Sequence, residues 1–170
     1  MFQVYDEWPQ IARKSFEIEN EPITLDVQND IVFSGMGGSG AIGNVFAAIL
    51  SKSKIHVDVV KGYLLPKTVD SKTIVIVVSI SGNTEETLAT LESAHKIGCK
   101  IIAFSSGGKI SKYCKENKIK HFMIPQYHSP RASFTSFLYT ILNTLHDSLK
   151  IKHSDIIESI KELEDKVYKR

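Results

Sequence analysis

The stretch SISGNTEET, residues 79–87, places hydroxyl side chains directly after an apolar run, TIVIVV (73–78). The hydroxyls belong to Ser79, Ser81, Thr84 and Thr87, at the point where a strand pattern changes to a helix pattern. Hydroxyls donate hydrogen bonds to phosphate oxygens without adding charge, and a helix N-terminus favours an anion. The stretch therefore predicts a phosphate-binding loop. The alternative is that Ser81 and Thr84 only cap the helix.

A glycine-rich stretch, GMGGSG (35–40), follows a second short apolar run, DIVFS (30–34). Its small residues leave backbone N–H groups exposed at the start of a helix, which again suits an anion. Neither stretch contains the lysine of a P-loop, and this argues against a nucleoside triphosphate with its magnesium. A single phosphate on a small molecule fits the two stretches better.

GMGGSG also matches G-x-G-x-x-G, the fingerprint of dinucleotide-binding folds. In those folds an acidic residue at the end of the second strand holds the ribose. This chain has Lys61 and Gly62 at that point, and Asp58 lies inside the strand. A dinucleotide would also leave the hydroxyls of 79–87 unexplained, so a dinucleotide-binding domain is the weaker alternative.

Strand-like and helix-like segments alternate along the chain. The predicted strands are 30–34, 54–60, 73–79, 100–105 and 121–125, and the predicted helices between and after them are 41–50, 84–98, 109–117 and 131–150. This alternation predicts an α/β fold, a three-layer αβα sandwich with a five-stranded parallel sheet. In the flavodoxin-like order 2-1-3-4-5, the first and third strands are neighbours, so 35–40 and 79–87 should face one crevice.

The composition of the whole chain excludes several classes of protein. The 170 residues are 42% hydrophobic and 24% charged, as in one soluble domain, and a net charge of +2 is too small to predict nucleic-acid binding. Cys99 and Cys114 lack metal-site or disulfide-framework spacing, so we expect no metal, no cofactor and a reducing, cytoplasmic location. No signal peptide or membrane-spanning run is expected.

Three stretches together resemble the SIS (sugar isomerase) domain, and within it the first half of the bifunctional phosphoglucose/phosphomannose isomerases. They are GMGGSG (35–40), SISGNTEETL (79–88) and SPRASFTSFLYTIL (129–142). The resemblance implies an aldose–ketose isomerase that interconverts glucose 6-phosphate or mannose 6-phosphate with fructose 6-phosphate. It implies that Ser79, Ser81 and Thr84 hold the phosphate. It also implies that the sugar is lined by Gly37, Gly38 and Ser39.

The resemblance further implies that Arg131 stabilises an enediolate. Aldose–ketose isomerisation removes a proton beside a carbonyl, and a fixed cation next to the resulting oxyanion lowers the barrier. The residues alone also fit a solvated Arg131 in the first turn of a helix after Pro130.

The reaction also needs a base and a ring-opening group. The resemblance implies that these come from a second SIS domain, which we expect to be absent because the chain stops at Arg170. Candidate substitutes within the chain are Glu85, Glu86 and His128. Glutamates in a first helical turn are also ordinary partners of the helix dipole. By contrast, His95 falls on the apolar stripe of its predicted helix and is expected in the core.

Both ends of the chain predict amphipathic helices, over 2–18 and over 155–170. The second places Ile156, Ile160, Leu163 and Val167 on one seam, which needs a surface to cover it. We expect a SIS domain over 1–150, with the helix of 151–170 serving as a linker or packing in a homodimer.

Three functions remain open from the sequence. The first is the isomerase, either as the N-terminal half of a longer enzyme or as a dimer completed by its own second copy. The second is a sugar-phosphate-binding module without chemistry. The third is the dinucleotide-binding domain.

Overall fold

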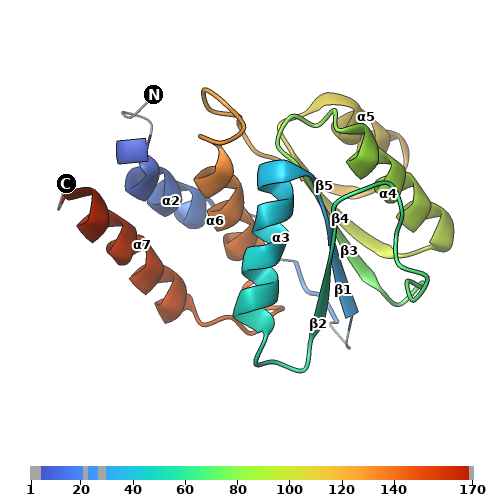
Figure 1. Ribbon diagram of the computed structural model, residues 1–170, viewed down its shortest axis with the longest axis horizontal. Helices are drawn as coiled ribbons and strands as arrows, with labels where there is room; N and C mark the ends of the chain where they lie inside the picture. Colours follow the sequence, from blue (N-terminus) through green and yellow to red (C-terminus); the bar gives the residue numbers. More distant parts are fainter. Residues whose placement is uncertain (1–4, 21–22, 27–29, 169–170) are drawn as a thin grey trace. The chain divides into compact units, whose positions relative to one another are not determined.

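The computed structural model describes residues 5–20, 23–26 and 30–168. Its sheet has five parallel strands in the order β2-β1-β3-β4-β5 (Figure 1), which confirms the predicted α/β fold and strand order. The strands are β1 (Asp30–Ser34), β2 (His56–Val60), β3 (Ile74–Ser79), β4 (Lys100–Ser105) and β5 (Lys120–Met123). The helices are α2 (Trp8–Glu17), α3 (Gly37–Leu50), α4 (Glu85–Ile97), α5 (Gly108–Glu116), α6 (Phe134–Leu145) and α7 (His153–Tyr168).

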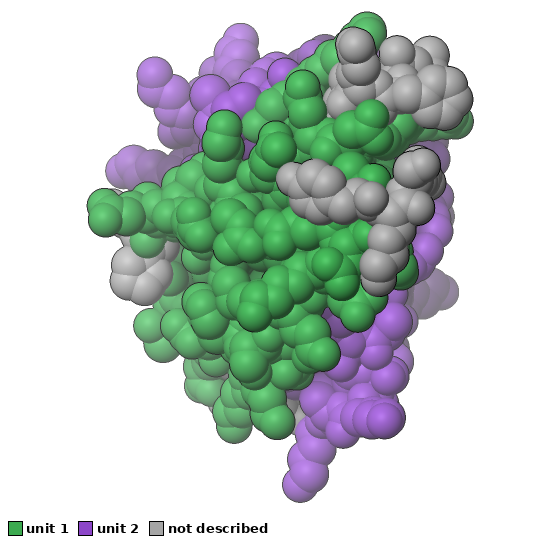
Figure 2. All heavy atoms as spheres, turned by 90° about the vertical axis from the view of Figure 1, so that its left-hand side faces the viewer, with its two compact units in different colours: residues 1–26, 127–170 green, residues 27–126 purple. Residues whose placement is uncertain are grey.

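The chain divides into two compact units, which are coloured separately in Figure 2. Unit 2 is residues 27–126 and holds the sheet with α3, α4 and α5; unit 1 is residues 1–26 and 127–170 and holds α2, α6 and α7. None of the described helices has the length and apolar character that a membrane crossing requires.

The central strand β3 is buried along its whole length, as its continuous β-branched run predicted. Successive residues of a strand point to opposite faces, so neighbouring residues of β1 pack in different layers. Phe33 stacks on Phe46 of α3 at a ring-centroid distance of 4.8 Å. Val32 belongs instead to the core cluster with Leu91 of α4 and Ile110 of α5. Helices therefore cover both faces of the sheet, and unit 2 has three layers.

In unit 1, the helices are joined by polar contacts as well as by apolar packing. Arg13 of α2 donates to the Glu164 carboxylate of α7 at 2.7 Å, and the Ser15 and Ser136 hydroxyls of α2 and α6 lie 3.3 Å apart. The predicted seam of α7 is partly covered, because Ile156 and Ile160 are buried while Leu163 and Val167 are half-buried. Residues 2–4 and 169–170 of the predicted end helices lie outside the described residues.

Three expectations from the sequence need correction. The first helix of unit 2 begins at Gly37, four residues before its predicted start, so that the last four residues of GMGGSG are already helical. The helix α6 is shorter than 131–150, and Arg131 lies in the turn before it. The core prediction for His95 was wrong: the side chain is exposed, and its Nδ1 lies 3.1 Å from the Tyr113 hydroxyl of α5.

Candidate functional site at the carboxyl ends of β1 and β3

The two unusual loops of the sequence meet, as predicted. Strands β1 and β3 are hydrogen-bonded neighbours, and both end at the same edge of the sheet. The backbone N–H of Ile80 donates to the Ser39 hydroxyl at 3.3 Å. This bond joins the first turn of α3 to the loop after β3.

The loop after β3 is closed by its own hydroxyls. The Ser79 hydroxyl lies 3.0 Å from the Thr84 hydroxyl and accepts from the backbone N–H of Gly82 at 3.1 Å. Gly82 has φ +70°, a left-handed conformation that side chains other than glycine adopt at a cost. These contacts curl residues 79–84 into a tight loop directly before α4.

The start of α4 is left without a side-chain cap. Thr84 is the N-cap residue, yet its side chain makes no capping bond and contacts Ser79 instead. The first N–H groups of a helix otherwise seek an acceptor from outside the helix. Ser81 is exposed, and its oxygen accepts from the N–H of Asn83 at 3.2 Å, which leaves its hydroxyl hydrogen available to a ligand. This arrangement favours an anion over simple capping.

Thr87 differs from the other three hydroxyl residues. Its side chain is only 1% exposed, and its Oγ1 has no hydrogen-bond partner. A buried hydroxyl on the inner side of α4 is badly placed to reach a ligand at the helix start. We therefore leave Thr87 out of the proposed phosphate site.

The glycine-rich loop presents backbone at the start of α3. Gly37 and Gly38 are exposed, and a Cβ added to either would meet no atom within 4 Å. Met36, the N-cap residue, makes no side-chain bond to the first turn. Gly35 is the tight position, because a Cβ there would lie 2.8 Å from the carbonyl oxygen of Val78. The loop thus packs on β3 at Gly35 and stays open at Gly37 and Gly38.

The two glutamates after the loop differ in their surroundings. Glu85 is exposed, and its carboxylate lies 3.8 Å from the Lys109 ammonium at the start of α5. Glu86 is half-buried in the same first turn of α4. Both positions agree with the interpretation that first-turn carboxylates balance the helix dipole.

Arg131 and His128 belong to unit 1, so their place beside the loops of unit 2 stays a prediction. Both side chains are exposed. Their turn is held by serine hydroxyls: Ser133 donates to the carbonyl oxygen of Ser129 at 2.9 Å and accepts from the N–H of Tyr127 at 2.8 Å. These two serines, which the sequence reasoning did not single out, fix the backbone on either side of Arg131.

Sequence reasoning also missed a third loop, residues 105–109 (SSGGK), at the end of β4. The N–H of Ile110 donates to the carbonyl oxygen of Gly82 at 3.0 Å, so this loop packs directly on the loop after β3. Behind it, Ser105 contacts His121, and burial lowers the pKa of that imidazole. The adjacent glycines, Gly107 and Gly108, were the available signal.

No cluster of three or more His, Cys, Asp or Glu side chains within residues 5–20, 23–26 and 30–168 is arranged to hold a metal ion. The hydroxyl and backbone N–H groups of the two loops are donors for an anion rather than ligands for a cation.

Comparison with known proteins identifies the family. The family model described as SIS domain matches residues 24–145. A bifunctional phosphoglucose/phosphomannose isomerase of Caldicellulosiruptor bescii is 39% identical over 138 residues, which cover 78% of this chain and 40% of that protein. The Aquifex aeolicus protein of the same name is 36% identical over 156 residues, which cover 89% of this chain and 49% of that protein.

A solved structure of a protein from Escherichia coli CFT073 has the same fold. It superimposes with a TM-score of 0.63 at 23% identity and covers 93% of this chain and 96% of that chain. The chain belongs to the SIS domain family, as its motifs predicted. It spans about half the length of the curated relatives it matches.

Proposed function

We propose that this chain binds a hexose 6-phosphate and carries one part of the site of an aldose–ketose isomerase of the phosphoglucose/phosphomannose type. The observation that carries the proposal is the pair of open helix N-termini at adjacent strand ends, α3 with exposed glycines and α4 with the hydroxyls of Ser81 and Thr84. A phosphate dianion is the ligand that these donors suit. The two relatives described above, from Caldicellulosiruptor bescii and Aquifex aeolicus, carry the name of that isomerase.

In the proposed reaction, the phosphate anchors the substrate and the chemistry takes place at C1 and C2. A base removes the proton from the carbon beside the carbonyl, and the electron pair moves to the carbonyl oxygen to form an enediolate. Arg131 stabilises that negative charge. Proton return to the neighbouring carbon completes the interconversion of aldose and ketose, with no net change of oxidation state.

The proposal names one candidate for the base and one for the ring-opening group. Glu86 is the better of the two candidate glutamates, because Glu85 is paired with Lys109. His128 is the candidate ring-opening group, next to Arg131 in sequence.

The second candidate function is a phosphosugar-binding module without chemistry. It is favoured by the ion pair of Glu85 with Lys109, which gives one of the candidate bases a partner within the protein. The two functions make the same prediction for binding and opposite predictions for proton exchange.

Proton NMR of fructose 6-phosphate in D₂O with the full chain separates the two functions. An enediolate mechanism replaces a carbon-bound proton with deuterium, so loss of that signal supports the isomerase, and Glu86→Gln should then abolish the loss. Line broadening without exchange supports the binding module. Neither effect, together with binding of a dinucleotide, would overturn both in favour of the dinucleotide-binding alternative.

A homodimer and a cytoplasmic location complete the proposal. Support for the dimer is an apolar groove of about 420 Å³ on unit 1, where Trp8, Phe134 and Leu163 are half-buried. Light scattering of the purified chain tests it, and a monomer at micromolar concentration would contradict it. Both cysteines are unpaired, as in a reducing compartment.

A further inference from the structure

Asn83 lies in the middle of the loop after β3, but its side-chain amide is already occupied by the protein. Its Oδ1 accepts from the backbone N–H of Lys109 at 3.0 Å, and its Nδ2 donates to the carbonyl oxygen of Ser81 at 3.2 Å. The first bond reaches across to α5, and the second returns to the backbone of the loop. Asn83 therefore has a structural partner on each side, one in the loop itself and one at the start of α5.

The start of α5 takes its cap from this same loop. Gly107, the N-cap residue, has no side chain to offer, yet two of the first N–H groups are satisfied. The N–H of Lys109 donates to Asn83 Oδ1, and the N–H of Ile110 donates to the carbonyl oxygen of Gly82, each at 3.0 Å. The cap of one helix is thus supplied by the loop that precedes another helix.

Glycines lie at the contact between the loop after β3 and the 105–109 loop. A Cβ on Gly82 would lie 1.9 Å from the carbonyl oxygen of Gly107, and a Cβ on Gly108 would lie 2.6 Å from Asn83 Oδ1. Both glycines have left-handed backbone, at φ +70° and +68°. The loops can approach this closely only because Gly82 and Gly108 carry no side chain there.

The 105–109 loop is in turn anchored to the edge strand β5. The Ser105 hydroxyl lies 2.8 Å from His121 Nε2 and 3.0 Å from the carbonyl oxygen of Gly107, and Ser105 is 0% exposed. Hydrogen bonds therefore connect β5 to the 105–109 loop through His121 and Ser105. They connect the 105–109 loop to the loop after β3 through Lys109 and Asn83.

We infer that Asn83 is a positioning residue, through which the 105–109 loop holds the loop after β3 in its ligand-binding conformation. The inference rests on the proposed function for the nature of the ligand, a hexose 6-phosphate. It assigns the affinity for that ligand partly to residues that do not touch it. Ser81 and Thr84 then face the start of α4 because Asn83 and Gly108 fix the backbone between and behind them.

Four variants of the full chain test the inference. Asn83→Ala removes the acceptor for Lys109, and Asn83→Asp keeps an acceptor oxygen there. Gly108→Ala pushes a methyl group into Asn83 from outside the ligand loop. Gly107→Ala is the control within the same loop, because its φ of +132° also disfavours a side chain while its Cβ would meet no atom within 4 Å.

Two quantities are measured at a temperature at which circular dichroism shows every variant to be folded. The first is the dissociation constant for fructose 6-phosphate by calorimetry, and the second is the hydrogen-exchange rate of the Lys109 amide by NMR. We expect Asn83→Ala and Gly108→Ala to weaken binding about tenfold and to speed exchange at Lys109 by a similar factor. Asn83→Asp should restore the slow exchange at Lys109, and Gly107→Ala should bind within about threefold of wild type.

Each outcome decides the inference. Unchanged affinity in Asn83→Ala, or a Gly108→Ala effect no larger than that of Gly107→Ala, would overturn it. Exchange at Lys109 as fast in Asn83→Asp as in Asn83→Ala would also overturn it. If wild type binds no fructose 6-phosphate, the proposed function fails by itself. The Lys109 exchange rates and the Ser81 amide shift in Gly108→Ala then still decide whether Asn83 positions the loop.

Discussion

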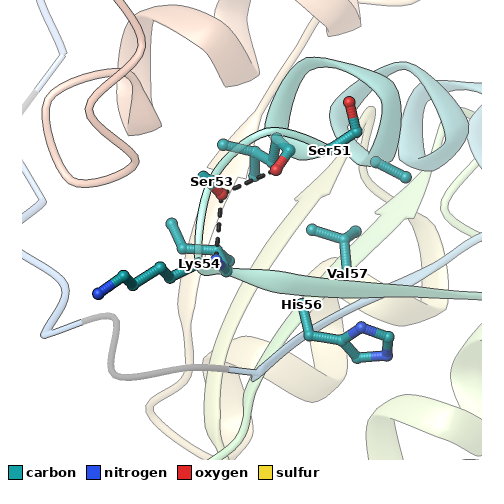
Figure 3. A pocket seen from close by; sticks show the side chains of 8 residues that line it. Ser51, Ser53, Lys54, His56 and Val57 are labelled. Atoms are coloured by element: carbon teal, nitrogen blue, oxygen red, sulfur yellow. Dashed lines mark hydrogen bonds between the residues drawn. The ribbon is translucent and has the colours of Figure 1, made fainter.

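The two ends of the sheet in unit 2 make opposite use of the same residue types. At the carboxyl ends of β1 and β3, serine and threonine hydroxyls gather at the N-termini of α3 and α4. At the other end, a hollow of about 350 Å³ lies between the end of α3 and the start of β2 and is also lined by serines, with a lysine and a histidine (Figure 3).

The serines of that second hollow are already used. Ser51 donates to the carbonyl oxygen of Ala48, and Ser53 donates to that of Leu50, both at 2.8 Å. These carbonyls belong to the last turn of α3, the negative end of a helix dipole. In Figure 3 the side chains of Lys54 and His56 do not point toward one another.

The two ends of the sheet differ in which terminus of a helix lies there. They also differ in whether the serine hydroxyls already donate to the protein, as Ser51 and Ser53 do, or keep a hydrogen for a ligand, as Ser81 does. Helix N-termini meet at the carboxyl end of the sheet, whereas the C-terminus of α3 lies at the amino end.

The largest expected effect comes from removing the hydroxyls at the carboxyl end. The double variant Ser81→Ala with Thr84→Ala should weaken binding of fructose 6-phosphate at least about thirtyfold, because a hydrogen bond to a charged group contributes about 1.5–3 kcal/mol. Ser51→Ala with Ser53→Ala removes two hydroxyls from the other end and should leave the dissociation constant unchanged. Calorimetry on both double variants checks this, and equal effects would remove the distinction between the two ends.

The next largest effect is expected from the close contact between the loop after β3 and the 105–109 loop. Gly82→Ala should lower the free energy of unfolding by about 2 kcal/mol or more, because its Cβ would overlap the Gly107 carbonyl in a strained left-handed backbone. Urea unfolding measures this change. Gly62→Ala is the control, since its Cβ would meet no atom within 4 Å, and it should change stability by less than about 0.5 kcal/mol. A small change in the free energy of unfolding for Gly82→Ala would mean that the loop after β3 and the 105–109 loop are not in contact.

A smaller effect is expected for the bond between the glycine-rich loop and the loop after β3. Ser39→Ala leaves the N–H of Ile80 without its acceptor, which costs about 1 kcal/mol and should weaken fructose 6-phosphate binding about fivefold. Ser53→Ala likewise leaves the N–H of Ile55 without an acceptor, but at the other end of the sheet. Titrations of both single variants sharpen the comparison, and a stronger effect from Ser53→Ala would contradict it.

The smallest effect is a dependence of stability on pH through His121. Burial lowers the pKa of this imidazole below its ordinary value of about 6.5, so the unfolded chain binds more protons than the native state as the pH falls. The contribution is complete above about pH 6.5 and is lost progressively toward the lowered pKa. Urea unfolding at pH 7.5 and pH 5.0 should show a smaller loss for His121→Gln than for wild type.

The exposed His56 at the amino end of the sheet provides the control for this measurement. If His56→Gln and His121→Gln behave alike, the buried imidazole is not the group responsible.

Much of unit 2 was predictable because its signals are local. The strand 100–105 was predicted with its observed bounds, and β3 was recognised from a continuous β-branched run that only a strand covered on both faces tolerates. The order of the strands followed from the flavodoxin-like arrangement that five strands joined by crossover helices suggest. That order brought GMGGSG and the hydroxyl loop together before any contact between them was known.

The errors arose where a local pattern has two structural outcomes. Glycine is a poor helix former, so the sequence placed Gly37 and Gly38 in a loop, yet they form the first turn of α3. His95 shares a stripe with Leu88 and Leu91, but it lies beside Tyr113 at the exposed margin of that stripe. Periodicity predicts the side of the helix on which a residue lies, but it does not predict whether neighbouring elements bury that side chain.

By itself, the sequence determined that hydroxyls and glycines end two adjacent buried strands at helix N-termini, because residue type, order and period are sufficient for that. Only the tertiary structure decided which group accepts which hydrogen. It turned Thr84 from a cap toward Ser79, buried Thr87, and directed Asn83 to the start of α5. Those choices depend on distances of a few ångströms between atoms, within one loop for Thr84 and between two loops for Asn83, and no pattern of residue types encodes such distances.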